Sequence, residues 1–431
     1  MTEPDSLTAI LTDSAVARPL MCRDTGLATV DDAPGPDDPA GPIEPEPLDV
    51  DEPAAPAVAL DPVAIAPGAR LDKGIAVLRV SIADDPAGTR FQLAGDCPGL
   101  PLPDTVSDRQ RRPDLALADL SSDLRPWEVG RQLRSWSETK DELTEWLNAL
   151  LARHGESLRL IIDDRTGWEI PWELFWLPGS GSPYGAPGWL GAIVPVARRT
   201  APRRPGAIDQ STDRHDCCGE VVAYVDAAMS GDGEVLGRYG VIPLEDLDAV
   251  LDRLEVDDDR LGLIYLAAHG THSSSGNEFT LGDLSVFELE QAEVAALRRA
   301  RVFVFLNACH SARIMYDDRN NDLTPRGFAR AFLDHGARGV IGTSTPVGVD
   351  EACAIAEDLL CRLARGVPAA TALRDHRREV ARHHSMLNRR QLRERDGVQR
   401  TQAMLDAFGY LYFGYPDTTV RLATTDESAP P

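Results

Sequence analysis

The sequence lacks the features that mark secreted and membrane proteins. No apolar run in its 431 residues approaches the length needed to cross a bilayer, and the opening residues are acidic where a signal peptide would be basic. Its seven cysteines show no paired spacing, so no disulfide framework is expected. These absences together predict a cytoplasmic protein.

Positive charge is also scarce. The chain has 44 Lys and Arg against 69 Asp and Glu, which gives a net charge of −25. A field of this sign repels nucleic acids and anionic membrane surfaces, so we expect neither as a partner. The hydrophobic content of 43% supports a packed core.

Aromatic residues are missing from the first 62 positions. This segment holds 11 of the 32 prolines and 14 acidic residues against two arginines. It offers too few apolar groups to offset the entropy lost on ordering, so we predict a disordered acidic tail over residues 1–68. A short second tail is expected over residues 421–431. The acidic tail is interpreted either as a solubilising segment or as an inhibitory or recruiting one.

Strand and helix patterns alternate from about Leu71 onward, which predicts an α/β fold with a mostly parallel sheet and helices on both faces. We expect an N-terminal half over residues 70–205 and a catalytic half over residues 215–420. One helix is predicted to begin at Ser137 and end at Gly155, and an amphipathic element is predicted at residues 170–178.

Two apolar strands lead into reactive side chains. The run LIYLAA is followed by His269 and Gly270, and the run VFVFLNA is followed by Cys309. Carboxyl ends of adjacent parallel strands meet at one edge, so the two side chains are expected side by side. A thiol needs a nearby imidazole for activation or for protonation of a leaving amine.

Gly270 is expected to let a substrate backbone approach closely. The N–H groups of Gly270 and Cys309 are the predicted donors to a developing oxyanion. The alternative is structural, because a lone cysteine and a loop histidine often have no chemical role.

Several blocks in order resemble the CHAT peptidase family of caspase-like proteins, in the clan that includes separase. The matching blocks are IPWELFWLPG, AAHG, LNACHSA, HGARGVIGTSTPVGVDEA, RLARGVPAATALRDHRR and FGYLYFGYPD, within residues 75–420. The resemblance implies a caspase–haemoglobinase fold, a dyad of His269 and Cys309, and peptide hydrolysis without metal or cofactor. The chain departs from the family at Ala312, where a glycine is common.

The resemblance also implies a pocket residue. In separase-like relatives an acidic residue after the strand that follows the nucleophile receives a basic residue of the substrate, and Asp350 holds that place. A carboxylate there would favour Arg or Lys through a charge-assisted contact. The competing interpretation makes Asp350 the N-cap of the helix that follows.

The function predicted from these features is a cysteine endopeptidase of restricted specificity. It would cleave a protein partner under the control of a protein activator, in defence or cell death, as the family analogy implies. The alternatives are a catalytically silent caspase-like interaction module and an acyl-transfer enzyme acting on small molecules.

Other groups of residues suggest further sites. Residues 215–218 (His-Asp-Cys-Cys) suggest either a zinc site or an exposed polar loop, and His272 or His310 could replace His269 as the base. The basic run at 378–400 is expected to form one long helix that either is solvated or binds an acidic partner or this chain's own tail. Segments 198–206 and 315–327 are predicted to be exposed loops open to proteolytic processing.

Overall fold

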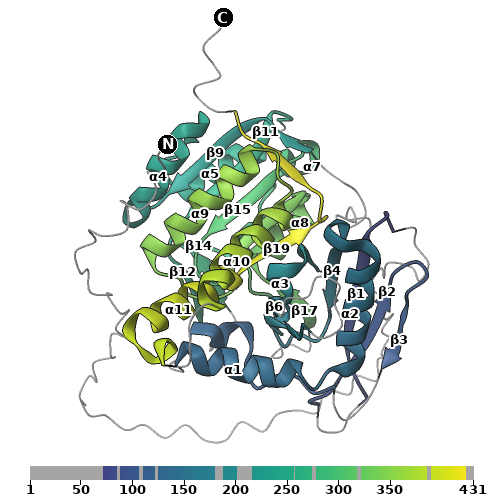
Figure 1. Ribbon diagram of the computed structural model, residues 1–431. Helices are drawn as coiled ribbons and strands as arrows, with labels where there is room; N and C mark the ends of the chain where they lie inside the picture. Colours follow the sequence, from purple (N-terminus) through teal and green to yellow (C-terminus); the bar gives the residue numbers. More distant parts are fainter. Residues whose placement is uncertain are drawn as a thin grey trace, which may run out of the picture. The chain divides into compact units, whose positions relative to one another are not determined.

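The structure is a computed structural model (Figure 1). It describes residues 71–84, 88–105, 110–121, 125–179, 188–200, 216–256, 258–273, 278–317, 322–385 and 390–423. The predicted tail at 1–68 and most of the predicted tail at 421–431 lie outside these ranges. So do residues 201–206 of the first predicted processing loop and residues 318–321 of the second.

An 11-stranded sheet forms the centre of the described fold. From one edge to the other its strands are β10 (Ile242–Pro243), β9 (Glu220–Val225), β11 (Leu261–Ala267), β15 (Phe303–Asn307), β18 (Gly339–Thr343), β19 (Tyr410–Gly414), β7 (Val196–Arg199), β4 (Arg159–Asp164), β1 (Ile75–Ile82), β2 (Phe91–Asp96) and β3 (Leu102–Thr105).

The sheet consists of two parallel blocks. Strands β10, β9, β11, β15 and β18 are parallel to their neighbours, and so are β19, β7, β4 and β1. The blocks meet at β18 and β19, which pair antiparallel, and β2 and β3 continue antiparallel at one edge. The prediction of a mostly parallel sheet is therefore confirmed.

Four small sheets lie outside the large one. They are β12 (Gly270–Ser273) with β13 (Glu278–Leu281) and β14 (Leu284–Ser285), β16 (Met315–Asp317) with β17 (Asp322–Arg326), β20 (Thr419–Arg421) with β8 (Asp216–Cys218), and β5 (Trp176–Leu177) with β6 (Gly188–Trp189). Strand β20 carries regular structure one residue into the predicted C-terminal tail.

Helices cover both faces of the sheet (Figure 1). They are α1 (Pro126–Ser137), α2 (Asp141–His154), α3 (Leu190–Ile193), α4 (Ser230–Leu236), α5 (Leu247–Glu255), α6 (Val286–Gln291), α7 (Ala295–Arg299), α8 (Phe328–His335), α9 (Val349–Ala364), α10 (Ala369–Ser385) and α11 (Arg395–Gly409). Within the described residues, none of these is both long and apolar enough to span a membrane.

Successive residues of the central strands enter different cores. In β11, Ile264 and Leu266 join the cluster that contains α5 to α8, whereas Leu263 and Tyr265 join the cluster that contains α4, α9 and α10. Side chains alternate between the faces of a strand, so a strand covered on both sides is apolar throughout. This alternation explains why the strands around the reactive residues are continuous apolar runs.

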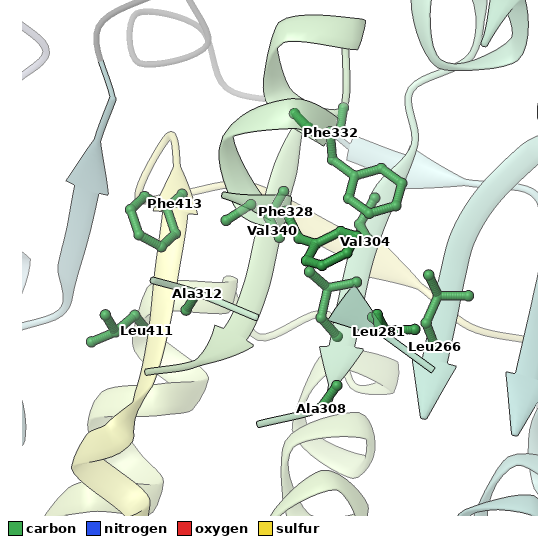
Figure 2. Close-up of a cluster of buried hydrophobic side chains, with 14 of the residues drawn as sticks. Leu266, Leu281, Val304, Ala308, Ala312, Phe328, Phe332, Val340, Leu411 and Phe413 are labelled. Carbon is green, nitrogen blue, oxygen red and sulfur yellow. The ribbon is translucent and has the colours of Figure 1, made fainter. Parts of the chain in front are cut away.

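Figure 2 shows part of the first cluster. Phe328 and Phe332 of α8 point toward Val304 of β15 and Val340 of β18, and all four side chains are buried. Burial of each such side chain contributes roughly 1.5–3 kcal/mol. This packing holds β15, whose carboxyl end carries Cys309, against its neighbour β18.

Two predicted elements differ in the structure. Ser137 does not start a helix but ends α1, and its hydroxyl donates to the Leu133 carbonyl and accepts from the Trp176 N–H. Helix α2 starts at Asp141 and ends at His154, and Gly155 follows its last turn as predicted. The amphipathic element at 170–178 is a 3₁₀ turn (Trp172–Leu174) followed by β5, because its aromatic side chains are buried among strands and not along a helix face.

Three further predictions need correction. The basic run at 378–400 forms the end of α10, a 3₁₀ turn (Gln391–Arg393) and the start of α11, so it is not one helix. Arg198 and Arg199 are buried in β7, so the segment at 198–206 does not begin as an exposed loop. The segment at 315–327 is framed by the paired strands β16 and β17.

Candidate active site

The two reactive residues follow neighbouring strands. Strands β11 and β15 are parallel partners, and their last pair is Ala267 with Asn307. His269 and Cys309 each come two positions after that pair. The ends of both strands therefore meet at the same edge of the sheet, as the sequence predicts.

Gly270 packs directly against the backbone of Cys309. A Cβ at this position would lie 1.8 Å from the Cys309 carbonyl oxygen and 2.9 Å from the Cys309 nitrogen. The peptide of Cys309 thus fills the space that a side chain would need. The expectation that Gly270 makes room for a substrate backbone is corrected: the approaching backbone belongs to Cys309 itself.

The N–H of Gly270 points away from its strand partner. Gly270 pairs with Leu281 across β12 and β13, while the Gly282 N–H donates to the carbonyl of His269. Residues of an antiparallel ladder alternate between bonded and non-bonded pairs, so Gly270 occupies a non-bonded position. Its N–H is directed out of the small sheet, as an oxyanion donor at the edge requires.

Two side chains hold the turn that carries Cys309. The Thr343 hydroxyl donates to the Ala308 carbonyl at 2.7 Å, and the Ser311 hydroxyl accepts from the Thr343 N–H at 3.1 Å. His310 between them has a φ of 62°, a left-handed conformation that costs energy for a residue with a side chain. Ala312 lies outside this strained position, so the loop needs no glycine there.

Cys309 is partly accessible at this turn. Its side chain is half-buried, and its Sγ lies 3.9 Å from the Val347 carbonyl oxygen. His269 is exposed, and no carboxylate of the described residues is bonded to its imidazole. Among the described residues, the His269 imidazole therefore has no carboxylate to orient it.

A buried polar network lies behind the nucleophile. The Asp232 carboxylate accepts from the Tyr265 hydroxyl and the Asn307 amide, both at 2.7 Å, and the Asn307 carbonyl oxygen accepts from the Tyr410 hydroxyl at 2.6 Å. All four side chains are at most 2% exposed. Burial, with Asp232 adding to it, raises the pKa values of both tyrosines. Sequence reasoning missed this network, although a polar Asn307 inside an apolar strand was a signal.

One of the two alternative bases, His272, is already in contact with an arginine. Arg313 donates to the His272 Nδ1 at 3.0 Å and forms a bidentate ion pair with Glu169 at 2.8 and 2.7 Å. Burial, followed by the charge of Arg313, lowers the pKa of His272 and lowers the pKa of His310 to about 4. Both imidazoles are therefore neutral near pH 7, and His272 offers no lone pair at Nδ1.

Asp350 is exposed in the first turn of α9. The N-cap of that helix is Gly348, with no side-chain capping bond, so the interpretation of Asp350 as the N-cap is wrong. The segment between β18 and α9 carries Val347, whose carbonyl faces the Cys309 sulfur. Asp350 thus lies three positions after Val347, the residue whose carbonyl faces Cys309.

The structure describes only residues 216–218 of the segment that suggested a zinc site. Cys217 is buried in β8, where burial raises the pKa of its thiol to about 12, and Cys218 is exposed. The expected exposed loop is therefore a strand from Asp216 onward, and His215 lies outside the described residues. In the described parts of the chain no group of three or more metal-ligating side chains is present.

A cysteine and a histidine thus follow neighbouring strands at the carboxyl edge of a mostly parallel sheet that helices cover on both faces. Residues 223–397 match the family model of the CHAT domain. The chain therefore contains a CHAT domain, and His269, Cys309 and Asp350 all lie inside the matched range.

Solved structures give a more distant likeness. Two structures of the Saccharomyces cerevisiae separase–securin complex match with TM-scores of 0.43 and 0.44 at 9% sequence identity. Each match covers 79% of this chain and 30% of the matched chain, so the likeness spans less than a third of that chain's length. No curated protein sequence matches this chain.

Proposed function

We propose that the CHAT domain is a cysteine endopeptidase with Cys309 as nucleophile and His269 as general acid and base. The observation that carries the proposal is the contact between Gly270 and the Cys309 peptide, since it fixes the two strand ends against each other. His269 takes the thiol proton as Cys309 Sγ attacks the peptide carbonyl, and it returns that proton to the leaving amine. Water then hydrolyses the thioester.

The oxyanion of each tetrahedral intermediate is assigned to the N–H groups of Gly270 and Cys309. The orientation of the Gly270 N–H away from β13 supports this role. Removing one such donor typically costs about 100- to 1000-fold in rate. No metal or cofactor is needed for this chemistry.

A preference for Arg or Lys before the cleaved bond is assigned to Asp350. Its exposed carboxylate stands in the first turn of α9, close in sequence to Val347 beside the nucleophile. The net charge of −25 adds a long-range attraction for basic substrates. The substrate is proposed to be a protein partner.

A protein activator is proposed to control the site, in a cytoplasmic defence or cell-death setting. The hairpins β12–β13 and β16–β17 follow closely after His269 and Cys309. A partner that contacts either hairpin would act directly on the proposed catalytic residues. The second candidate function is a caspase-like interaction module without turnover.

An activity-based probe with Arg or Lys at the recognition position tests the proposal. Labelling of the full chain should disappear in Cys309→Ala and His269→Ala. It should persist in Cys218→Ala, which removes an exposed thiol outside the site. Asp350→Asn should reduce the preference for basic over neutral probes by about tenfold or more.

Three results would each contradict a different part of the proposed function. A wild-type chain that stays unlabelled, even with the proteins encoded beside it, would favour the interaction module. Labelling of Cys309 that survives His269→Ala would remove the histidine from the mechanism. An unchanged preference in Asp350→Asn would remove only the pocket assignment.

A further inference from the structure

A groove of about 1190 Å³ lies away from the candidate active site. It is formed by α1, β5 and β6, α3, the end of α10, the 3₁₀ turn Gln391–Arg393 and α11, together with the end of α2 and the turn after it (Figure 1). It is larger than a typical small-molecule site. Neither His269 nor Cys309 contributes to it.

The groove has an aromatic floor. Trp176 and Trp189 meet edge to face, with ring centroids 4.9 Å apart. The Arg134 guanidinium lies over the Trp176 ring at 4.5 Å, and that of Arg393 lies over the Trp127 ring at 5.4 Å. Stacking of this kind holds a guanidinium flat and leaves the N–H groups on its edge able to donate. One of those of Arg134 already donates to Glu138 at 3.0 Å.

The charge of the groove is opposite to that of the chain. Five arginines and one carboxylate, Glu156, stand among the described residues that line it, whereas the whole chain has net charge −25. Glu156 is paired with Arg374 and Arg378. Arg131, Arg382 and Arg393 form no ion pair with a carboxylate of the described residues.

Two buried polar atoms in the groove also lack a partner. The Trp176 Nε1 and the His384 Nε2 make no hydrogen bond with the described residues. An indole N–H can only donate, so it requires an acceptor. Leaving a buried donor unpaired costs about 1–3 kcal/mol, which an acceptor on a ligand would recover.

We propose that this groove binds an acidic peptide segment of a protein partner. Carboxylates of the segment pair with the guanidinium groups of the arginines. An acceptor oxygen of the segment binds the indole N–H of Trp176, and an apolar side chain packs on the tryptophan rings. A nucleic acid is disfavoured because a long polyanion meets the repulsion of the whole acidic chain. A short peptide carries few charges, so local pairing dominates.

Fluorescence anisotropy with the full chain tests the proposal. The probe is a fluorescein-labelled, glutamate-rich decapeptide with leucine at two positions, and the control probe has glutamine in place of glutamate. The glutamate probe should bind and weaken as salt is raised. Arg131→Glu with Arg382→Glu should weaken binding about tenfold or more, whereas Arg111→Glu, an exposed site outside the groove, should not.

Trp176→Phe removes the indole N–H donor but keeps an aromatic ring, so it distinguishes the hydrogen bond from the apolar contact. It keeps most of the apolar floor, so the variant should fold and should bind the glutamate probe a few-fold more weakly. Binding is read without substrate turnover, so this test does not depend on the proposed peptidase.

Each of four results would overturn the proposal. They are no binding of the glutamate probe, equal binding of the glutamine probe, tighter binding of a single-stranded oligouridylate, and self-association of the chain that Arg382→Glu abolishes. A gain in affinity after the acidic residues between 44 and 52 are changed to amides would show that this chain's own segment occupies the groove. That result would contradict a partner as the occupant.

Discussion

A glycine is required at position 270, next to His269, because a side chain would have no space there and not because of the backbone conformation. Gly270 is absent from the glycines with a left-handed φ, yet a Cβ would clash with three backbone atoms of Cys309. Backbone atoms cannot swing aside as a flexible side chain can. Any substituent at this position must therefore move the nucleophile or the histidine.

Gly270→Ala should lower kcat/KM about 100-fold, because a displacement near 1 Å at a catalytic group has an effect of that size. Steady-state kinetics on a basic peptide substrate measure it, with circular dichroism as a check on folding. Gly233→Ala is the matched control, since no atom lies within 4 Å of a Cβ there. Equal activity in the two variants would show that the strand ends tolerate separation.

The placement of His269 and Cys309 at one edge of the sheet was predictable, because each follows an apolar strand and the ends of neighbouring parallel strands share one edge. Their surroundings were not. Glu169 and Arg313 stand 144 positions apart, and nothing in the local pattern of either indicates a bidentate pair. The distance from Gly270 to Cys309 depends on how far β15 runs before it turns, which periodicity does not report.

The Asp232 network shows how separate elements hold one turn. Asp232 belongs to α4, Tyr265 to β11, Asn307 to β15 and Tyr410 to β19. Their hydrogen bonds are buried, and removing one partner leaves the others unsatisfied. The network therefore ties the base of the Cys309 turn to three other elements.

Asp232→Ala should destabilise the fold by about 2–4 kcal/mol, because the Tyr265 hydroxyl and the Asn307 amide both lose their acceptor. Tyr410→Phe removes one hydrogen bond and should cost about 1 kcal/mol. Urea denaturation measures both, with the exposed Asp252→Ala as control. Similar values for Asp232→Ala and Asp252→Ala would contradict a structural role for the network.

Helix α11 contains a carboxyl group that burial keeps protonated. Burial raises the pKa of Asp406 from 3.8 to about 7, although the Gln402 amide donates to it at 2.8 Å. The folded state thus holds a proton that the unfolded state releases between about pH 4 and pH 7. Stability contributed by this group is full below the unfolded pKa and is lost as the pH rises toward 7.

Asp406→Asn should stabilise the protein at pH 8 by an amount on the order of 2–4 kcal/mol, because the amide stays neutral and keeps the oxygen that Gln402 contacts. The gain should shrink toward zero near pH 4. Urea denaturation of both proteins at several pH values measures it. A gain that is the same at every pH would mean that packing, and not ionisation, is the cause.

Element types were easier to predict than element boundaries and order. The strands of the second half follow from apolar runs between glycines, and helix α2 ends at Gly155, whose φ of 57° suits glycine. Helix α1 was missed because it follows a polar, proline-bearing stretch. The place of β19 between β18 and β7 is set by long-range pairing, to which local sequence patterns are insensitive.

The two predicted halves share one sheet across the β19–β7 boundary. Phe413 of β19 pairs with Arg198 of β7, and Arg378 of α10 donates to the carbonyls of Ala192 and Ile193 in α3. The ion pair of Arg313 with Glu169 adds a link in which both side chains are at most 10% exposed. Breaking one partner of such a pair leaves a buried charge, so the halves stabilise each other.

Cutting the chain between residues 201 and 215 should therefore leave the halves associated. A sequence-specific protease site inserted there, in a Cys309→Ser background, allows a clean cut. The cut protein should elute in gel filtration at the volume of the uncut insertion variant, and the fragments should separate only in denaturant. A gel of the eluted peak identifies both fragments.

Glu169→Ala provides the sharper test of this association. Its cut form loses the partner of Arg313 and should release a measurable share of free fragments at low protein concentration, since a buried guanidinium without its carboxylate costs about 3–5 kcal/mol. Glu138→Ala, which removes only an exposed ion pair within the first half, should elute like the unaltered cut protein. If the unaltered fragments already separate after the cut, the shared sheet is too weak to join the halves, and they would have to be treated as two domains.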